Sequence, residues 1–208
     1  INYRLVPDVT VNQQLQDVAR ALRWIRDHGS QYPCDMQNIM LTGDSAGGQL
    51  AAYSAVLMQS AQLRKTFDTV DPQMELTALL LTSPVAFMRD GGLFSLYTKP
   101  MWGTDYKDKA TYPYMDFDQI IDYAQALPPT YLITSSGDTL ANKQTHRLYE
   151  VLQAHGVQAE IKDYAKAEYN QSLPHVFSVL QPFEPAGTAA IDKALAFYQQ
   201  AMTAKAAQ

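Results

Sequence analysis

The sequence predicts an α/β fold in which a mostly parallel sheet is flanked by helices. Short apolar runs alternate with segments of helical periodicity, a pattern typical of parallel strands joined by crossover helices. With 208 residues, 47% of them hydrophobic, the chain is long enough to bury a substantial core. No repeat or linker interrupts it, so we expect a single domain over residues 1–208.

The first part of the chain contains three expected strands and two expected helices. Short apolar runs predict strands over residues 3–5, 38–42 and 76–82. Apolar residues at three- and four-residue spacing predict a helix over 12–28, and an alanine-rich segment predicts another over 49–61.

The last part of the chain repeats the alternation. The short run Tyr-Leu-Ile-Thr predicts a strand over residues 131–134, and the last strand is expected over 159–164. A helix over 142–155 lies between them, and an amphipathic helix over 188–202 follows.

A long aromatic insert, at about residues 85–128, separates these two parts and lacks strong periodicity apart from a short helix near 118–126. Long irregular segments in compact domains are usually binding walls or lids. We expect the insert to line an apolar pocket in which Phe87, Trp102 and, further along the chain, Phe177 contact a substrate.

Composition excludes several kinds of partner. Sixteen Lys and Arg against 21 Asp and Glu leave a net charge of -5, and no basic run could follow a nucleic-acid backbone. The densest apolar stretch is far shorter than the ~20 residues that cross a bilayer, so we expect no stable membrane insertion. The single cysteine, Cys34, cannot form an internal disulfide and is expected to be a buried packing residue. A lone cysteine favours a reducing compartment such as the cytoplasm, unless a signal sequence lies upstream. A homodimer is compatible with this composition.

The segment Gly43-Asp44-Ser45-Ala46-Gly47 lies between an expected strand and an expected helix. In a Gly-x-Ser-x-Gly turn the serine has a strained backbone that exposes its hydroxyl, and side chains at Gly43 and Gly47 would collide with neighbouring elements. Ser45 is therefore a candidate nucleophile. It lies at a helix N-terminus, where the amide of Ala46 can stabilise an oxyanion. For Asp44 a hydrogen-bonding role in the turn is expected.

A nucleophilic serine needs a base, and the chain has 4 histidines. His28 and His155 each end a helix before a glycine, and His146 lies within a helix where we expect a solvated face. His175 lies in a loop after the last expected strand and is the candidate base.

The acid that orients this histidine is expected in a loop after a strand between the serine and the histidine. Asp138 follows the strand over 131–134 and has that position. Asp163 is the rival, but it lies within a strand, where a solvated edge residue is expected.

These motifs resemble the hormone-sensitive-lipase-like branch of the α/β-hydrolases, which includes acetyl esterases and carboxylesterases. The likeness covers the Tyr-Arg-Leu-Val-Pro-Asp start at residues 3–8, the Gly-Asp-Ser-Ala-Gly-Gly elbow, Asp-Thr-Leu from Asp138 and His-Val-Phe from His175. It implies that Ser45 is the nucleophile, Asp138 the acid and His175 the base of a carboxylic-ester hydrolase. It also implies a small-molecule substrate, with short-chain or aryl esters favoured by the aromatic insert, and no metal or organic cofactor.

The chain departs from that family at three places. Asn142 and Lys143 stand where the family has a second acidic pair, and Val176 replaces a glycine. The family's His-Gly-Gly oxyanion loop, upstream of the Tyr-Arg-Leu segment, is absent. Without the strand before that loop, backbone groups of the 38–42 strand would lack a neighbour, at about 1 to 3 kcal/mol per buried unpaired group. We therefore expect upstream sequence with the missing strand, the loop and part of a cap.

Two other functions are compatible with these residues. A Ser-His-Asp triad does not by itself distinguish an ester from an amide, so a serine peptidase or amidase is an alternative. A non-catalytic ligand-binding protein of the same fold is another, although such receptors tend to lose the base, and His175 is present.

Overall fold

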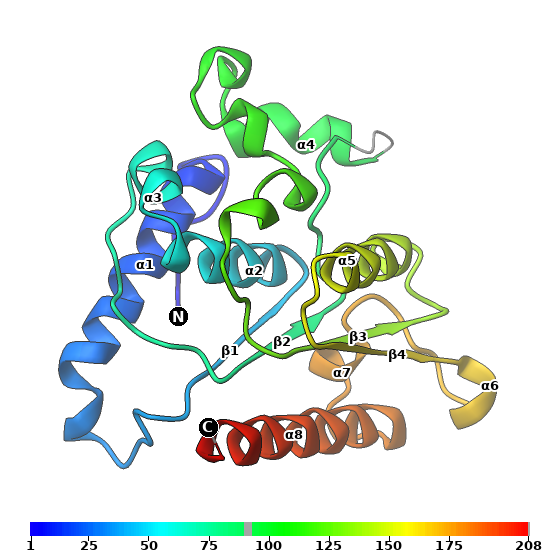
Figure 1. The fold of residues 1–208 in the computed structure, drawn as a ribbon. Helices are drawn as coiled ribbons and strands as arrows, with labels where there is room; N and C mark the ends of the chain where they lie inside the picture. The colour runs from blue at the N-terminus through cyan, green and yellow to red at the C-terminus, as the bar shows by residue number, and fades with distance from the viewer. Residues whose placement is uncertain (90–92, 208) are drawn as a thin grey trace. The chain divides into compact units, whose positions relative to one another are not determined.

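The structure, a computed structural model, describes residues 1–89 and 93–207. Its described residues form a parallel sheet in the order β1-β2-β3-β4, as Figure 1 shows. The strands are β1 (Met40–Asp44), β2 (Ala78–Thr82), β3 (Thr130–Ser135) and β4 (Ala159–Tyr164). The predicted α/β class with a parallel sheet is confirmed.

Helices connect and flank the strands. Single-turn 3-10 helices lie at 29–31, 106–108, 112–114, 117–119 and 121–123. The α-helices of the described chain are α1 (Val11–His28), α2 (Ser45–Gln59), α3 (Ala61–Phe67), α4 (Leu93–Trp102), α5 (Asn142–Ala154), α6 (Lys166–Tyr169), α7 (Phe177–Leu180) and α8 (Pro185–Ala206).

The chain divides into two compact units. The first comprises residues 1–36, 52–75 and 87–126, and the second comprises 37–51, 76–86 and 127–208. All four strands belong to the second unit. A single domain over the whole chain remains a prediction.

Strand β1 lies two residues later than the predicted strand over 38–42. Its last residues, Gly43 and Asp44, pair with Leu81 and Thr82 of β2, which extends the strand to the turn before Ser45. Helix α2 begins at Ser45 itself, four residues before the expected start at 49. The strand therefore passes directly into the helix, as a sharp turn carrying an exposed serine requires.

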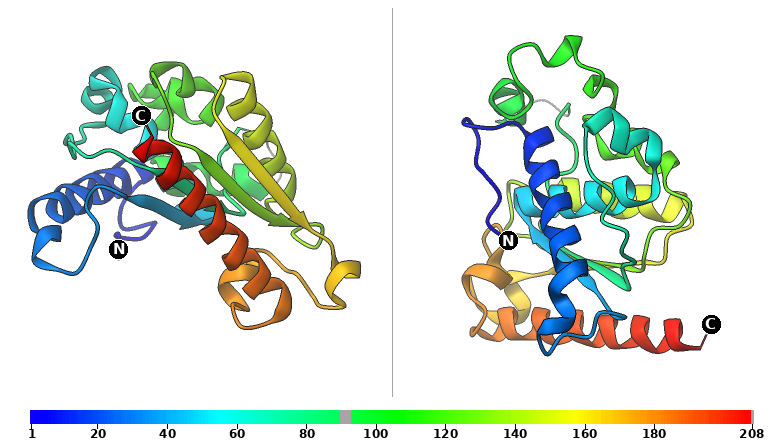
Figure 2. Two further views of the ribbon diagram at one scale, coloured as in Figure 1. Left: turned by 60° about the horizontal axis from the view of Figure 1, so that its bottom comes forward. Right: turned by 90° about the vertical axis from the view of Figure 1, so that its left-hand side faces the viewer.

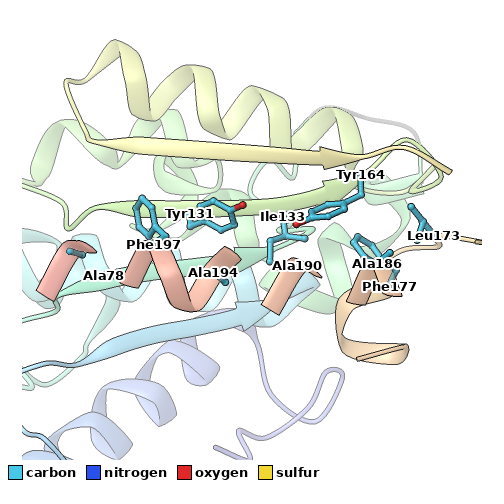
Figure 3. Packing of buried hydrophobic residues seen from close by; sticks show 11 residues of the cluster. Ala78, Tyr131, Ile133, Tyr164, Leu173, Phe177, Ala186, Ala190, Ala194 and Phe197 are labelled. Atoms are coloured by element: carbon cyan, nitrogen blue, oxygen red, sulfur yellow. The ribbon is translucent and has the colours of Figure 1, made fainter. Parts of the chain in front are cut away.

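The second unit has its core between the sheet and α8. Figures 1 and 2 show α8 along one face of the sheet and α5 along the other. Alanines at four-residue spacing on α8 let the helix approach the strands closely, and Phe197 fills the space beside Tyr131, with ring centroids 5.2 Å apart (Figure 3). The buried cluster contains Ala78, Tyr131, Ile133, Tyr164, Leu173, Phe177, Ala186, Ala190, Ala194, Phe197 and Ala201.

The first unit has an aromatic core of its own. Tyr53 packs edge-on against Phe67 and Phe117, with ring centroids 6.5 and 6.1 Å apart. The Tyr53 hydroxyl also donates to the carbonyl oxygen of Tyr114. The aromatic residues of the insert that take part in these contacts serve the packing of this unit.

The strand expected over residues 3–5 is wrong. These residues have no regular structure, and the backbone of Arg4 is bonded to side chains of α1. Its N–H donates to Asp17, and its carbonyl oxygen accepts from Gln14. Polar side chains of a helix therefore satisfy groups that a neighbouring strand would otherwise have bonded.

Four further expectations are corrected. The insert contains helix α4, which its weak periodicity does not predict, and the helix expected near 118–126 is replaced by two 3-10 turns. The short helices α3, α6 and α7 are also additional to the predicted elements. Cys34 is exposed, because it lies in the loop between α1 and β1 instead of on a buried element.

Within the described part of the chain, no helix combines the length and apolar character that crossing a bilayer requires.

Candidate active site

Three residues of the second unit lie in a hydrogen-bonded row. His175 Nε2 lies 2.8 Å from Ser45 Oγ, and His175 Nδ1 lies 3.0 Å from Asp138 Oδ2. Ser45 follows β1 and Asp138 follows β3, so both lie at the edge of the sheet where its parallel strands end. The structure thus brings together the three residues that the sequence singled out.

The turn at Ser45 is strained. Ser45 has a φ of 51°, in the left-handed region of backbone conformation that residues other than glycine rarely adopt. At Gly43 a Cβ atom would overlap the carbonyl oxygen of Gly47, so only glycine fits there. Gly48 lies close to the segment that follows β2, because a Cβ atom added at Gly48 would lie 2.9 Å from Cβ of Pro84. These contacts hold a half-buried serine hydroxyl at the start of α2.

The Asp138 carboxyl group is fully buried and bonded on both oxygens. Oδ1 accepts from the N–H groups of Leu140 and Ala141, and Oδ2 faces His175. Burial by itself would raise the pKa of Asp138. The hydrogen bonds from His175 and Ala141, with the nearby Ser83 hydroxyl, outweigh burial and hold this pKa below its usual value. Asp138 is therefore an anion at neutral pH.

The charge of Asp138 determines the tautomer of His175. A carboxylate can only accept hydrogen bonds, so His175 Nδ1 must carry a proton and donate it to Oδ2. In the neutral ring, Nε2 then has a free lone pair that accepts from the Ser45 hydroxyl. This is the arrangement in which a histidine can remove the serine proton.

A direct link joins the loops that carry the acid and the histidine. Ser135, the last residue of β3, donates its hydroxyl to the carbonyl oxygen of Leu173 at 2.6 Å. Gly137 lies against the same carbonyl oxygen, and a Cβ atom there would overlap it. Neither contact is evident from the amino-acid sequence, although Ser-Ser-Gly-Asp directly after a strand is a signal of a tight turn.

The remaining candidate residues lie in different surroundings. Ala46 is exposed in the first turn of α2, where backbone N–H groups have no partner within the helix, and Asp44 is exposed at the end of β1. Phe177 is fully buried in the core cluster, where its ring packs 5.3 Å from that of Tyr164. This side chain therefore serves packing, and contact with a substrate stays a prediction.

Phe87 and Trp102 lie in the first unit, and both are buried. Phe87 forms an isolated antiparallel bridge with Asp116, and Trp102 ends α4. Their expected contact with a substrate stays a prediction.

His146 and Asp163, both expected at solvated positions, are hydrogen-bonded to each other. His146 Nε2 lies 2.9 Å from Oδ2 of Asp163, and both side chains are half-buried. The amide of Asn142 donates to the same oxygen at 2.9 Å. Residues 142 and 146 are one turn apart on α5 and face β4 together, a pairing that strand register creates and chain spacing does not reveal.

A parallel sheet whose strand ends carry a serine elbow and a buried carboxylate, with a histidine on a later loop, is the architecture of the α/β-hydrolases. The chain belongs to the alpha/beta hydrolase fold family, whose model matches residues 1–173.

Named relatives of this chain are esterases. The "Probable carboxylic ester hydrolase LipM" of Mycobacterium tuberculosis is 27% identical over 201 residues, which are 94% of this chain and 46% of that protein. An acetyl esterase of Salmonella choleraesuis is 25% identical over 179 residues, 79% of this chain and 52% of that protein. The chain thus spans about half the length of these two curated relatives.

A solved structure with the same fold is esterase B from Lactobacillus rhamnosis. It superposes with a TM-score of 0.89 and 29% identity over 99% of this chain and 66% of that chain. The same esterase has also been solved with a C4-C4 tributyrin phosphonate inhibitor, and that structure is 30% identical to this chain.

Proposed function

We propose that this chain is a serine hydrolase of carboxylic esters. The observation that carries the proposal is the row Ser45, His175 and Asp138, in which each neighbouring pair lies within hydrogen-bond distance. The esterase names of its relatives support the same reaction class.

The mechanism follows from the protonation states. His175 Nε2 takes the proton of Ser45 as Oγ attacks the ester carbonyl carbon and forms a tetrahedral oxyanion. The N–H of Ala46, at the start of α2, is a donor to that oxyanion, and the helix dipole adds to its effect. The proton then passes to the leaving alkoxide, which departs as an alcohol. His175 then takes a proton from water, whose oxygen attacks the acyl carbon. The bond from that carbon to Ser45 Oγ breaks, His175 returns the proton to Oγ, and the carboxylic acid leaves.

Asp138 supports both proton transfers. Its buried negative charge lies beside Nδ1 and stabilises the imidazolium that forms when Nε2 accepts a proton. Its two backbone hydrogen bonds hold the carboxylate in place without a change in charge.

The preferred substrates in this proposal are short-chain or aryl esters. The inhibitor of the esterase B structure is a tributyrin phosphonate with C4 chains, which supports short acyl groups by similarity. The aryl preference rests on the aromatic-rich composition of residues 85–128 alone.

Replacement of Ser45 by alanine tests the proposal. The variant should hydrolyse p-nitrophenyl acetate about 10⁴-fold or more slowly than the parent chain, because removal of a triad member leaves only residual catalysis. A fluorophosphonate should label the parent at Ser45 and leave the variant unlabelled.

The matched control is Ser30→Ala, which removes a hydroxyl from an exposed turn of the first unit and should keep the parental rate. A Ser45→Ala variant as active as the parent would refute the proposal. Comparison of an ester with its matched amide decides between an esterase and an amidase.

A further inference from the structure

We propose that Asn142 is a positioning residue for the acid of the Ser45, His175 and Asp138 row. The inference rests on the proposed function, because it concerns the geometry that the reaction needs.

The turn that carries Asp138 is closed by a single backbone hydrogen bond. The N–H of Asp138 donates to the carbonyl oxygen of Ser135 at 3.0 Å. The side-chain amide of Asn142 donates to that same oxygen at 2.9 Å. The N–H of Asn142 also bonds the carbonyl oxygen of Asp138 at 3.3 Å. Asn142 therefore forms hydrogen bonds at both ends of this turn, from its side chain to Ser135 and from its backbone N–H to Asp138.

The Asn142 amide is itself held from the neighbouring strand. Its Nδ2 donates to Asp163 Oδ2 on β4 at 2.9 Å and lies 3.4 Å from Oγ1 of Thr134 on β3. Thr134 and Asp163 are paired in the sheet register, so two adjacent strands orient one amide. A side chain fixed by several partners loses little further freedom during the reaction, and this is what positioning requires.

The position of Ser135 affects both loops of the site. Its carbonyl oxygen accepts from the N–H of Asp138, and its hydroxyl donates to the carbonyl oxygen of Leu173, in the loop before His175. A shift of Ser135 would therefore displace both the Asp138 turn and the loop before His175, and unequal displacements would change the 3.0 Å separation between Asp138 Oδ2 and His175 Nδ1. Asn142 acts on the reaction through Asp138 and has no contact with Ser45 or His175 among the described hydrogen bonds.

His146 provides a matched control. Both Asn142 and His146 bond Asp163 Oδ2, but only Asn142 also bonds Ser135. Asn142→Ala and His146→Ala therefore each remove one partner from Asp163, and Asn142→Ala also removes the donor to the Ser135 carbonyl oxygen and the longer 3.4 Å contact with Thr134 Oγ1.

The test measures kcat and KM with p-nitrophenyl butyrate, using the endpoint of fluorophosphonate labelling to count functional sites. For Asn142→Ala we expect kcat per labelled site to fall about 10- to 100-fold with KM within about threefold, the scale of a misplacement of ~1 Å. The rate of labelling should fall with kcat. His146→Ala should keep kcat per labelled site within about threefold of the parent.

A purely structural role would reduce the labelled fraction or the melting temperature and leave the rate per labelled site unchanged. Parental kcat in Asn142→Ala, or equal losses in Asn142→Ala and His146→Ala, would overturn the inference. If Asn142→Ala does not fold, Asn142→Leu carries the test with the same expectation, because it nearly keeps the volume but cannot donate to Ser135. A parent chain that fluorophosphonate does not label at Ser45 would instead refute the proposed function.

Discussion

At the scale of single residues, two buried carboxyl groups show how surroundings set charge. Asp138 accepts hydrogen bonds on both oxygens, and these hold its pKa low despite burial. Asp116, in the first unit, accepts from the N–H groups of Met88 and Arg89 on one oxygen. There burial outweighs the hydrogen bonds and, with the like charge of Asp118, raises the pKa of Asp116. Asp138, hydrogen-bonded on both oxygens, is thus kept ionised, whereas burial makes Asp116 costly to ionise.

Asp116→Asn should remove a pH-dependent loss of stability. A raised pKa means that the folded state binds the proton more tightly than the unfolded state, whose Asp titrates near ~3.9. The free energy of unfolding of the parent should therefore fall as pH rises from about 4 through the raised pKa of Asp116. The amide of the substituted side chain can still accept from Met88 and Arg89 but does not ionise.

Urea unfolding of both proteins at pH 4 and pH 7 checks this expectation. The stability of the variant relative to the parent should increase with pH. A relative stability that is constant or decreases over this range would show that Asp116 ionises at least as readily in the folded as in the unfolded chain.

At the scale of elements, the site depends on close approach between turns. The turn after β3 lies against the loop before His175, with Gly137 touching the carbonyl oxygen of Leu173. The hydroxyl of Ser135, two residues earlier in the chain, bonds the same oxygen. The distance between acid and histidine is therefore set by loop contacts outside the three residues themselves.

Gly137→Ala should separate these loops. The new methyl group would overlap the Leu173 carbonyl oxygen, and we expect a stability loss of about 1 to 3 kcal/mol. We expect kcat for p-nitrophenyl butyrate to fall at least about 10-fold. Steady-state kinetics and thermal unfolding measure the two effects.

Gly156→Ala is the control for this substitution. Gly156 has a φ of 71° and open space around it, so alanine there costs about 1 to 2 kcal/mol of backbone strain without a clash. It should keep the parental kcat. Equal kcat in Gly137→Ala and Gly156→Ala would contradict the role of the loop contact.

At the scale of the whole molecule, the chain has a separate core in each of its compact units. The core of the second unit supports the sheet whose strand ends carry Ser45 and Asp138. Helix α8 presents small side chains to that sheet, and Phe197 supplies the bulk that fills the remaining space (Figure 3).

Phe197→Ala should weaken the second unit. Removal of a buried phenyl ring that packs against Tyr131 is expected to cost about 3 to 5 kcal/mol of stability. Hydrogen exchange of backbone amides in β2 and β3 should become faster. Leu195→Ala, on the outer side of α8, should change stability by no more than about 0.5 kcal/mol. A Phe197→Ala variant with parental exchange in β2 and β3 would show that this core does not limit the opening of the sheet.

Local chemistry allowed much of this structure to be predicted. The strand over 159–164 has its predicted bounds, and helix α1 differs from its prediction by one residue, because strong periodicity is a local property. The elbow at Ser45 was predictable because glycine and serine at those spacings serve one backbone geometry.

By itself, the sequence determined the α/β class and singled out Ser45, Asp138 and His175. Only the tertiary structure decided that residues 3–5 form no strand, and that Asn142 and His146 share the carboxylate of Asp163. The reason is physical: a strand exists only where its backbone groups find a strand partner, and Arg4 bonds side chains of α1 instead. Contacts between α5 and β4 likewise depend on sheet register, which brings together residues 17 and 21 positions apart in the chain.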